Sequence, residues 1–199
     1  MTDRATRTRP LVIVASFAGS LVVGLLVMLS LMGGFRGVAA PAAIGGPFEL
    51  TDQSGQTVTE KNLVGHPTLV FFGFTHCPDV CPTELFEISE VLRVMGKDAD
   101  GVSAYFISVD PERDTTAAMK DYLSSFDPRL KGLTGDPEAV AKAISGYRVY
   151  AKKVPLKDGD YTMDHTALIY LMDRDGKFVA PFNLKRKPEE AAADLKRYL

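Results

Sequence analysis

Cysteine is scarce in this sequence, which has only Cys77 and Cys81 in 199 residues. Two cysteines four positions apart cannot form the multi-bridge disulfide framework of a small secreted scaffold. The pair therefore indicates a redox centre or a metal site, and a single structural disulfide is the alternative. The sequence also lacks internal repeats and low-complexity segments after the first 47 residues.

A large excess of positive charge is also absent. Without Asp3, Arg4, Arg7 and Arg9 the chain keeps 20 basic and 24 acidic residues, a net charge of −4. Such a surface does not suggest nucleic-acid binding. The one basic run, residues 185–187, is short enough to be the solvated face of a helix start. We therefore expect no nucleic-acid partner.

Charge is missing altogether from Leu11–Met32, a run of 22 residues. A helix of this length, at about 1.5 Å per residue, would cross a hydrocarbon core of about 30 Å. A cleaved signal peptide with Val38–Ala40 as the cut site is the alternative. However, the run is longer than the roughly 7–15 apolar residues of a signal-peptide core. We therefore predict one transmembrane anchor over residues 11–32.

The charges beside this run predict its orientation. Three arginines crowd residues 1–10, whereas the other flank offers only Arg36 before Lys61. The positive-inside rule then leaves residues 1–10 in the cytoplasm and exports the rest of the chain. A short N-terminus without a Ser/Arg-rich transit stretch favours a bacterial protein. The predicted location is the inner membrane, crossed once, with the C-terminal domain in the periplasm.

The remaining residues divide into a linker and one domain. Residues 33–47 are rich in Gly, Ala and Pro and contain one charge, which is typical of a linker. From Phe48 to Leu199 the hydrophobic and charged residues suit a single globular domain.

Strands and helices alternate along this predicted domain. Short runs of β formers and turn signals predict a β-hairpin over Phe48–Thr59 and strands over Thr68–Phe74, Val102–Val109, Tyr147–Lys153, Ala167–Met172 and Lys177–Phe182. Helical spacing and capping signals predict helices over Pro82–Met95, Ala117–Phe126, Pro137–Ile144 and Pro188–Leu199. This order predicts an α/β class domain with a thioredoxin-like fold and an extra N-terminal β-hairpin.

The two cysteines follow a predicted buried strand and stand at the start of a predicted helix. A thiol in this position gains from the helix dipole and from unpaired backbone N–H groups, which favour the thiolate. Three residues separate Cys77 from Cys81, one more than in the usual thioredoxin-type pair. The longer loop can close a redox-active disulfide, and it also allows both sulfurs to converge on one ion.

A third candidate ligand is His165, 84 residues after Cys81. It lies just before a predicted hairpin strand, in the loop that faces the cysteines in thioredoxin-like folds. That loop ordinarily carries a proline, and residues 162–166 contain none. We therefore predict a metal site of two sulfurs and one nitrogen, and a surface histidine at a strand entrance is the alternative.

The predicted donor set favours copper. Thiolate and imidazole suit copper and zinc alike, but only three ligands in an exported protein favour three-coordinate Cu(I) over a closed structural zinc site. Cu(II) would accept the same donors with an added water or carboxylate.

Other residues lie near these motifs in the sequence. Asp164 either orients the imidazole or is a solvated turn residue. Asp110 and Asp114 are predicted to shape the rim of the site, and Asp114 as a cap of the next helix is equally open. His76 is a possible fourth ligand, whereas His66 is predicted to be structural.

Three motifs together resemble the Sco/SenC family. They are Phe74–Pro82 with its CxxxCP pattern, Asp110–Asp114, and Asp164–His165, and the resemblance covers about Phe48 to Leu199. It implies a membrane-anchored copper chaperone with thiol-disulfide activity for the CuA centre of cytochrome c oxidase subunit II. The family's copper ligands correspond to Cys77, Cys81 and His165 here.

The resemblance leaves copper delivery, reduction of the partner's cysteines and redox sensing open. The runner-up function is therefore a membrane-tethered thiol-disulfide oxidoreductase or redox sensor. A peroxidase of peroxiredoxin type is disfavoured, because it needs a Thr-x-x-Cys motif and the spacing from Thr75 to Cys77 is wrong.

Overall fold

The structure is a computed structural model that describes residues 19–30, 43–157 and 159–199. The chain forms two units, Met1–Ala42 and Ala43–Leu199. In the first unit, residues 19–30 are helical. Within the described residues, no helix combines the length and the apolar character that a membrane span requires. The predicted anchor over 11–32 lies partly outside the described residues.

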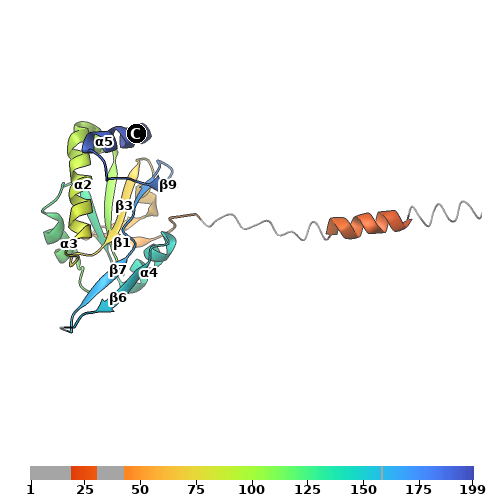
Figure 1. Ribbon diagram of the computed structural model, residues 1–199, viewed down its shortest axis with the longest axis horizontal. Coiled ribbons are helices and arrows are strands. Elements are labelled where there is room, and N and C mark those ends of the chain that lie inside the picture. The colour runs from red at the N-terminus through yellow and green to blue at the C-terminus, as the bar shows by residue number, and fades with distance from the viewer. Residues whose placement is uncertain (1–18, 31–42, 158) are drawn as a thin grey trace, which may run out of the picture. The chain divides into compact units, whose positions relative to one another are not determined.

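The second unit is a mixture of strands and helices (Figure 1). Its strands are β1 Glu49–Asp52, β2 Thr57–Thr59, β3 Thr68–Gly73, β4 Ser103–Ser108, β5 Leu130–Thr134, β6 Ala151–Pro155, β7 Tyr161–His165, β8 Ile169–Met172 and β9 Phe178–Pro181. Its α-helices are α2 Val80–Met95, α3 Thr116–Leu123, α4 Pro137–Gly146 and α5 Pro188–Leu195. Short 3-10 helices cover Glu60–Leu63, Gly96–Gly101 and Lys196–Tyr198.

Seven of these strands form one mixed sheet in the order β2-β1-β5-β4-β3-β8-β9. Neighbours β3 and β4 are parallel, as are β4 and β5, whereas the remaining pairs are antiparallel. This arrangement confirms the predicted α/β class and the thioredoxin-like fold. The predicted N-terminal hairpin is β1 and β2, and it joins the sheet through β5.

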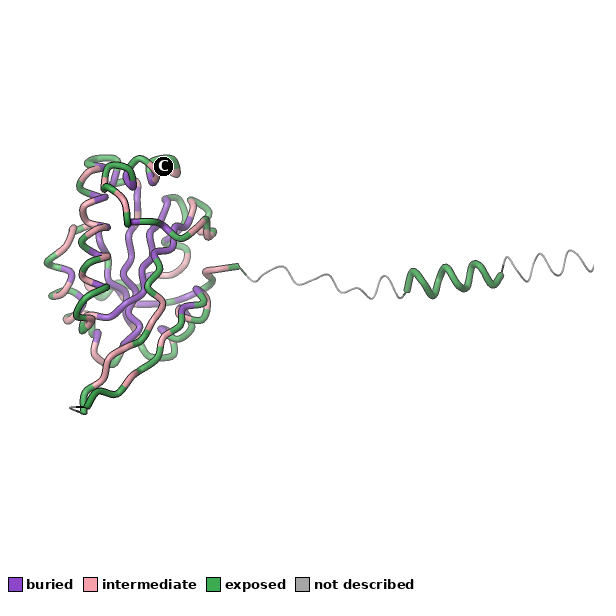
Figure 2. Tube along the Cα trace, in the orientation of Figure 1, coloured by how far each residue is buried: buried purple, intermediate pink, exposed green. Residues whose placement is uncertain are grey.

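Both faces of the central strand β3 are covered. All six of its residues are buried, and successive side chains point to opposite faces. The Phe71 ring lies 5.8 Å from the ring of Phe106, whereas Phe72 lies 5.2 Å from Tyr147 at the end of α4. In Figure 1, α2 and α5 lie together on one side, and α4 lies beside β6 and β7. Figure 2 shows the buried strands between these layers.

Two boundaries predicted around the cysteines and after α4 differ from the structure. The helix α2 begins at Val80 rather than Pro82, so Cys81 lies in its first turn. The strand predicted from Tyr147 begins only at Ala151. Tyr147 ends α4 instead, because its ring is buried against Phe72 and belongs to the core.

Two features of the sheet were not predicted. The sequence does not indicate β5, because Lys131 and Gly132 interrupt its apolar pattern. Residues 161–165 form the strand β7 rather than the expected loop, and this strand pairs with β6 in a separate two-stranded sheet and not with the main sheet. This β6–β7 hairpin extends away from the main sheet (Figure 1). The hairpin matters because β7 ends at His165, which lies opposite Ala151.

Candidate metal site

The two cysteines meet at the beginning of α2. Cys77 lies in the loop after β3, and Cys81 lies in the first helical turn. The backbone N–H of Cys81 donates to the Sγ of Cys77 at 3.4 Å. The N-cap residue Asp79 makes no capping bond with its side chain. The Cys77 sulfur therefore accepts one of the N–H groups that a helix leaves unpaired in its first turn.

The two thiols differ in their exposure. Cys81 is fully buried, whereas Cys77 is partly exposed, and both are free thiols. Burial strongly raises the pKa of the Cys81 thiol. For Cys81 this corrects the expectation that the helix start favours the thiolate, because loss of solvent outweighs the helix dipole. A bound cation would offset that cost, so Cys81 suits metal binding better than free nucleophilic chemistry.

The imidazole of His165 faces these sulfurs. Its Nε2 lies 3.6 Å from the Sγ of Cys81, and its Nδ1 lies 3.1 Å from the carbonyl oxygen of Thr166. Because that carbonyl can only accept, the proton is assigned to Nδ1. The lone pair of Nε2 then points to the site. The ring of Phe74 stands edge-on to the imidazole, with centroids 5.7 Å apart, and supports its orientation.

The structure brings all three predicted ligands together. One donor atom from each of Cys77, Cys81 and His165 lies within 4.8 Å of the others. Two sulfurs and one imidazole nitrogen at this spacing can converge on a single ion. The described residues therefore form a site with one buried ligand, Cys81, and two partly exposed ones, Cys77 and His165.

Gly73, at the end of β3, leaves room for the buried sulfur. A Cβ on this residue would lie 2.6 Å from Cε2 of Phe106 and 2.7 Å from the Sγ of Cys81. We expect Gly73→Ala to lower the free energy of unfolding by about 1–3 kcal/mol, measured by chemical denaturation, because the added methyl group overpacks the core. It should also weaken metal binding.

Gly146→Ala is the matched control, because a Cβ there meets its nearest atom at 3.7 Å. This helical substitution should leave stability unchanged or raised. Equal stability of the Gly73→Ala and wild-type chains would contradict the close packing of Cys81.

The two aspartates after β4 are buried beside the site. Asp110 accepts from the Nε of Arg113 at 2.5 Å and from the hydroxyl of Tyr161 at 2.9 Å. Asp114 accepts from the hydroxyl groups of Thr75 and Ser108, both at 2.6 Å. Burial raises the pKa of Asp114, although these hydrogen bonds oppose that shift.

Asp114 is therefore not the cap of the next helix. That role belongs to Thr115, whose side chain accepts from the N–H of Ala118. Asp114 instead joins the segment after β4 to Thr75, two residues before the first cysteine.

The remaining candidates lie outside the cluster of three ligands. His76 is exposed, and its Nδ1 lies 3.1 Å from the hydroxyl of Thr75. His66 is exposed before the opposite end of β3. Asp164 is exposed on β7, and adjacent strand residues point to opposite faces. The contact at His165 Nδ1 is made by the Thr166 carbonyl.

Sequence reasoning did not identify Tyr161, and it included Arg113 only as part of the Asp110–Asp114 motif, with no role of its own. Tyr161 and His165 are four residues apart on β7, so they share one face of the strand. That alternation would have indicated Tyr161 if the strand had been recognised. The motif did not indicate that Arg113 contacts β7.

The fold and the site define a class, a thioredoxin-fold protein with a metal site of two thiols and one imidazole. The family model described as SCO1/SenC matches residues 36–199. The chain belongs to the SCO1/SenC family.

Its relatives include both curated proteins and solved structures. The chain is 43% identical over 157 residues to "Protein SCO2 homolog, mitochondrial" of Danio rerio, covering 77% of this chain and 56% of that protein. The structure of Bradyrhizobium japonicum ScoI with copper bound is 80% identical, with a TM-score of 0.78, and covers 79% of this chain and 100% of that chain. The chain spans about half the length of three curated relatives that it matches.

A more distant structure shares the fold. It is that of BsSco, described as a member of the Sco family of cytochrome c oxidase assembly proteins. It is 22% identical, with a TM-score of 0.62, and covers 81% of this chain and 96% of that chain.

Proposed function

We propose that this protein is a copper chaperone that delivers copper to the CuA centre of cytochrome c oxidase subunit II. The observation that carries the proposal is the convergence of Cys77, Cys81 and His165 within 4.8 Å. Copper is the cargo of this site. The partly exposed Cys77 supports transfer, because an incoming thiolate of the partner can reach the metal while the other ligands still hold it.

The choice of copper rests on the donors and on the relatives. Soft thiolates select Cu(I), and the imidazole nitrogen also suits Cu(II). A copper-bound relative that is 80% identical supports the same cargo here. The second candidate, a thiol-disulfide oxidoreductase, is favoured by the two free thiols and their 3.4 Å N–H···S contact. We rank this second function below copper delivery, because reduction of a partner does not need His165.

The proposal includes an anchor over residues 11–32 with the domain in the periplasm. Anchoring to the same membrane would raise the effective concentration of the two partners, so a weak and transient interface would suffice. The apolar run and its arginine-rich N-terminal flank support this part of the proposal.

His165→Ala is expected to weaken Cu(II) binding by about 100-fold or more, because Cu(II) loses its nitrogen donor. Cu(I) should lose much less, since two thiolates can hold Cu(I) in linear geometry. The measurement is competition titration of the full chain in detergent with each oxidation state, together with the Cu(II) spectrum.

His76→Ala is the matched control, because this exposed imidazole is one residue from Cys77 and outside the cluster. It should bind both ions like the wild type. An unchanged Cu(II) spectrum and affinity in His165→Ala would remove His165 from the site.

A further inference from the structure

We infer that Arg113 and Tyr161 are positioning residues that hold His165 at the metal site, whereas Asp114 separately holds the cysteine loop. The inference rests on the proposed function, since it concerns how the site holds copper. The segment between β4 and α3 would then fix the position of His165 and the position of the cysteine loop through separate contacts.

The first contact joins this segment to the strand that carries His165. The Tyr161 hydroxyl donates to Oδ1 of Asp110 at 2.9 Å, and Asp110 is 2% exposed. Arg113 donates to Oδ2 of the same carboxylate and also to the carbonyl oxygen of Tyr161 at 3.0 Å. A charged group makes each bond stronger than a neutral pair would. The first residue of β7 is therefore held by one hydrogen bond to Asp110 and one from Arg113, and these two residues are bonded to each other.

The second contact continues from Arg113 to the imidazole. The guanidinium carbon of Arg113 lies 3.7 Å from the ring centroid of Tyr161 and 5.9 Å from that of Phe74. Phe74 in turn stands edge-on to His165 at 5.7 Å. Arg113 thus contacts both the start of β7 and the aromatic ring beside the ligand at its end. Removing the guanidinium should therefore weaken the hold on the start of β7 and on the ring of Phe74.

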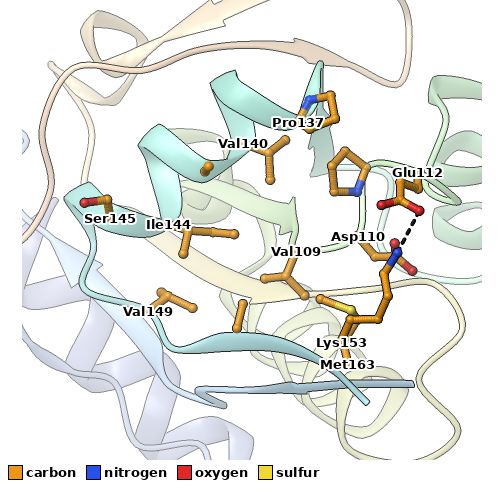
Figure 3. Close-up of a pocket in the computed structure, with 13 residues that line it drawn as sticks. Val109, Asp110, Glu112, Pro137, Val140, Ile144, Ser145, Val149, Lys153 and Met163 are labelled. Carbon is orange, nitrogen blue, oxygen red and sulfur yellow. Dashed lines mark hydrogen bonds and ion pairs between the residues drawn. The ribbon is translucent and has the colours of Figure 1, made fainter. Parts of the chain in front are cut away.

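The β6–β7 hairpin needs such contacts because its backbone does not pair with the main sheet. A two-stranded hairpin alone is marginally stable in water. Figure 3 shows one further link, in which Lys153 of β6 reaches Glu112, at 2.7 Å. This pair is exposed, so it contributes little. The contacts of Asp110 and Arg113 therefore add a polar anchor for the hairpin and His165 to the apolar packing of Ala151 and Met163 against the core.

The cysteine loop is held by Asp114 and not by the contacts of Asp110 and Arg113. Both carboxylate oxygens of Asp114 accept from the backbone N–H of Thr75, at 3.2 and 3.3 Å, and Oδ1 also accepts from the Thr75 hydroxyl. Asp114 is fully buried. These bonds hold the chain two residues before Cys77 and do not involve β7. Loss of this contact should affect the thiols, and so both oxidation states of copper.

Arg113→Gln and Tyr161→Phe test the inference in the full chain purified in detergent. We expect each to weaken Cu(II) binding by about 10- to 100-fold, the range for groups that orient a metal-bound histidine. Cu(I) affinity should change by less than about threefold, since the two thiolates stay in place. The nitrogen hyperfine signal of His165 in the Cu(II) spectrum should weaken in parallel. Thr75→Val should instead weaken Cu(I) and Cu(II) alike.

A double-mutant cycle with His165→Ala separates positioning from general destabilisation. If Arg113 acts through His165, Arg113→Gln should cause no further loss of Cu(II) affinity in the His165→Ala chain. A role in overall stability would give the same loss in both backgrounds. Tyr161→Phe keeps the ring and removes one hydroxyl, so it tests the inference even where Arg113→Gln fails to fold.

The matched control is Arg129→Gln. Arg129 also pairs with an aspartate, Asp127, at 2.7 Å, and this pair precedes β5 away from the ligands. It should leave copper binding unchanged. Unchanged Cu(II) affinity in both test variants, or an equal loss in the His165→Ala background, would overturn the inference and leave the proposed function standing. A wild-type chain that binds no copper would refute the proposed function, and with it the inference.

Discussion

Replacing either Cys77 or Cys81 with serine is expected to lower copper affinity by at least about a thousandfold, because each change removes one of two thiolates and a hydroxyl is a poor ligand for soft Cu(I). The loss should exceed that of His165→Ala for Cu(I). The measurement is the copper that remains bound to the full chain after dialysis against a competing chelator.

Oxidation should have the same effect without any mutation. Closing a Cys77–Cys81 disulfide removes two protons and two electrons, and neither sulfur then keeps a thiolate for the metal. The oxidised chain should bind copper only after reduction by a dithiol. Full copper stoichiometry in the oxidised chain would mean that the site lies elsewhere.

Met163→Leu is the control for sulfur chemistry, because Met163 lies on β7 two residues before His165. Leucine keeps the volume and apolar character of methionine. This variant should bind copper like the wild type.

Copper binding should also depend on pH. Since burial raises the pKa of the Cys81 thiol, the metal-free chain keeps that proton at neutral pH. The metal must displace it, so affinity should rise with pH, by about tenfold per unit for each proton released.

A strain that lacks this protein is expected to lose most of its CuA signal and cytochrome c oxidase activity when copper is scarce. The reason is that the CuA domain would no longer receive copper from a partner concentrated at the same membrane. Added copper should partly restore both. Haem-copper oxidases without a CuA subunit should keep their activity and serve as the internal control. The measurements are oxidase turnover and the CuA spectrum of isolated membranes.

Complementation with Cys81→Ser and with His76→Ala makes this test specific to the site. The first should fail and the second should succeed, since only Cys81 belongs to the ligand cluster. A normal CuA signal in the deletion strain under copper limitation would favour a thiol reductase or a redox sensor.

The local sequence determined the chemistry of this protein and much of its fold. The CxxxC pattern after an apolar strand indicated two thiols at a helix start, because β formers and helical spacing are local properties of the chain. The turn signals around residues 52–55 and 173–176 likewise predicted the β1–β2 and β8–β9 hairpins, but not the β6–β7 hairpin. The three candidate ligands could be predicted without the structure, since their residue types and motifs are visible in the sequence.

The tertiary structure decided what surrounds those ligands. The burial of Cys81, which reverses the expected effect of the helix start, depends on α2 packing over Gly73 and Phe106. The role proposed for Arg113 depends on its contact with Tyr161, which lies 48 residues further along the chain on β7. No local pattern encodes such contacts, because they form only when distant segments pack together and exclude water from the groups between them.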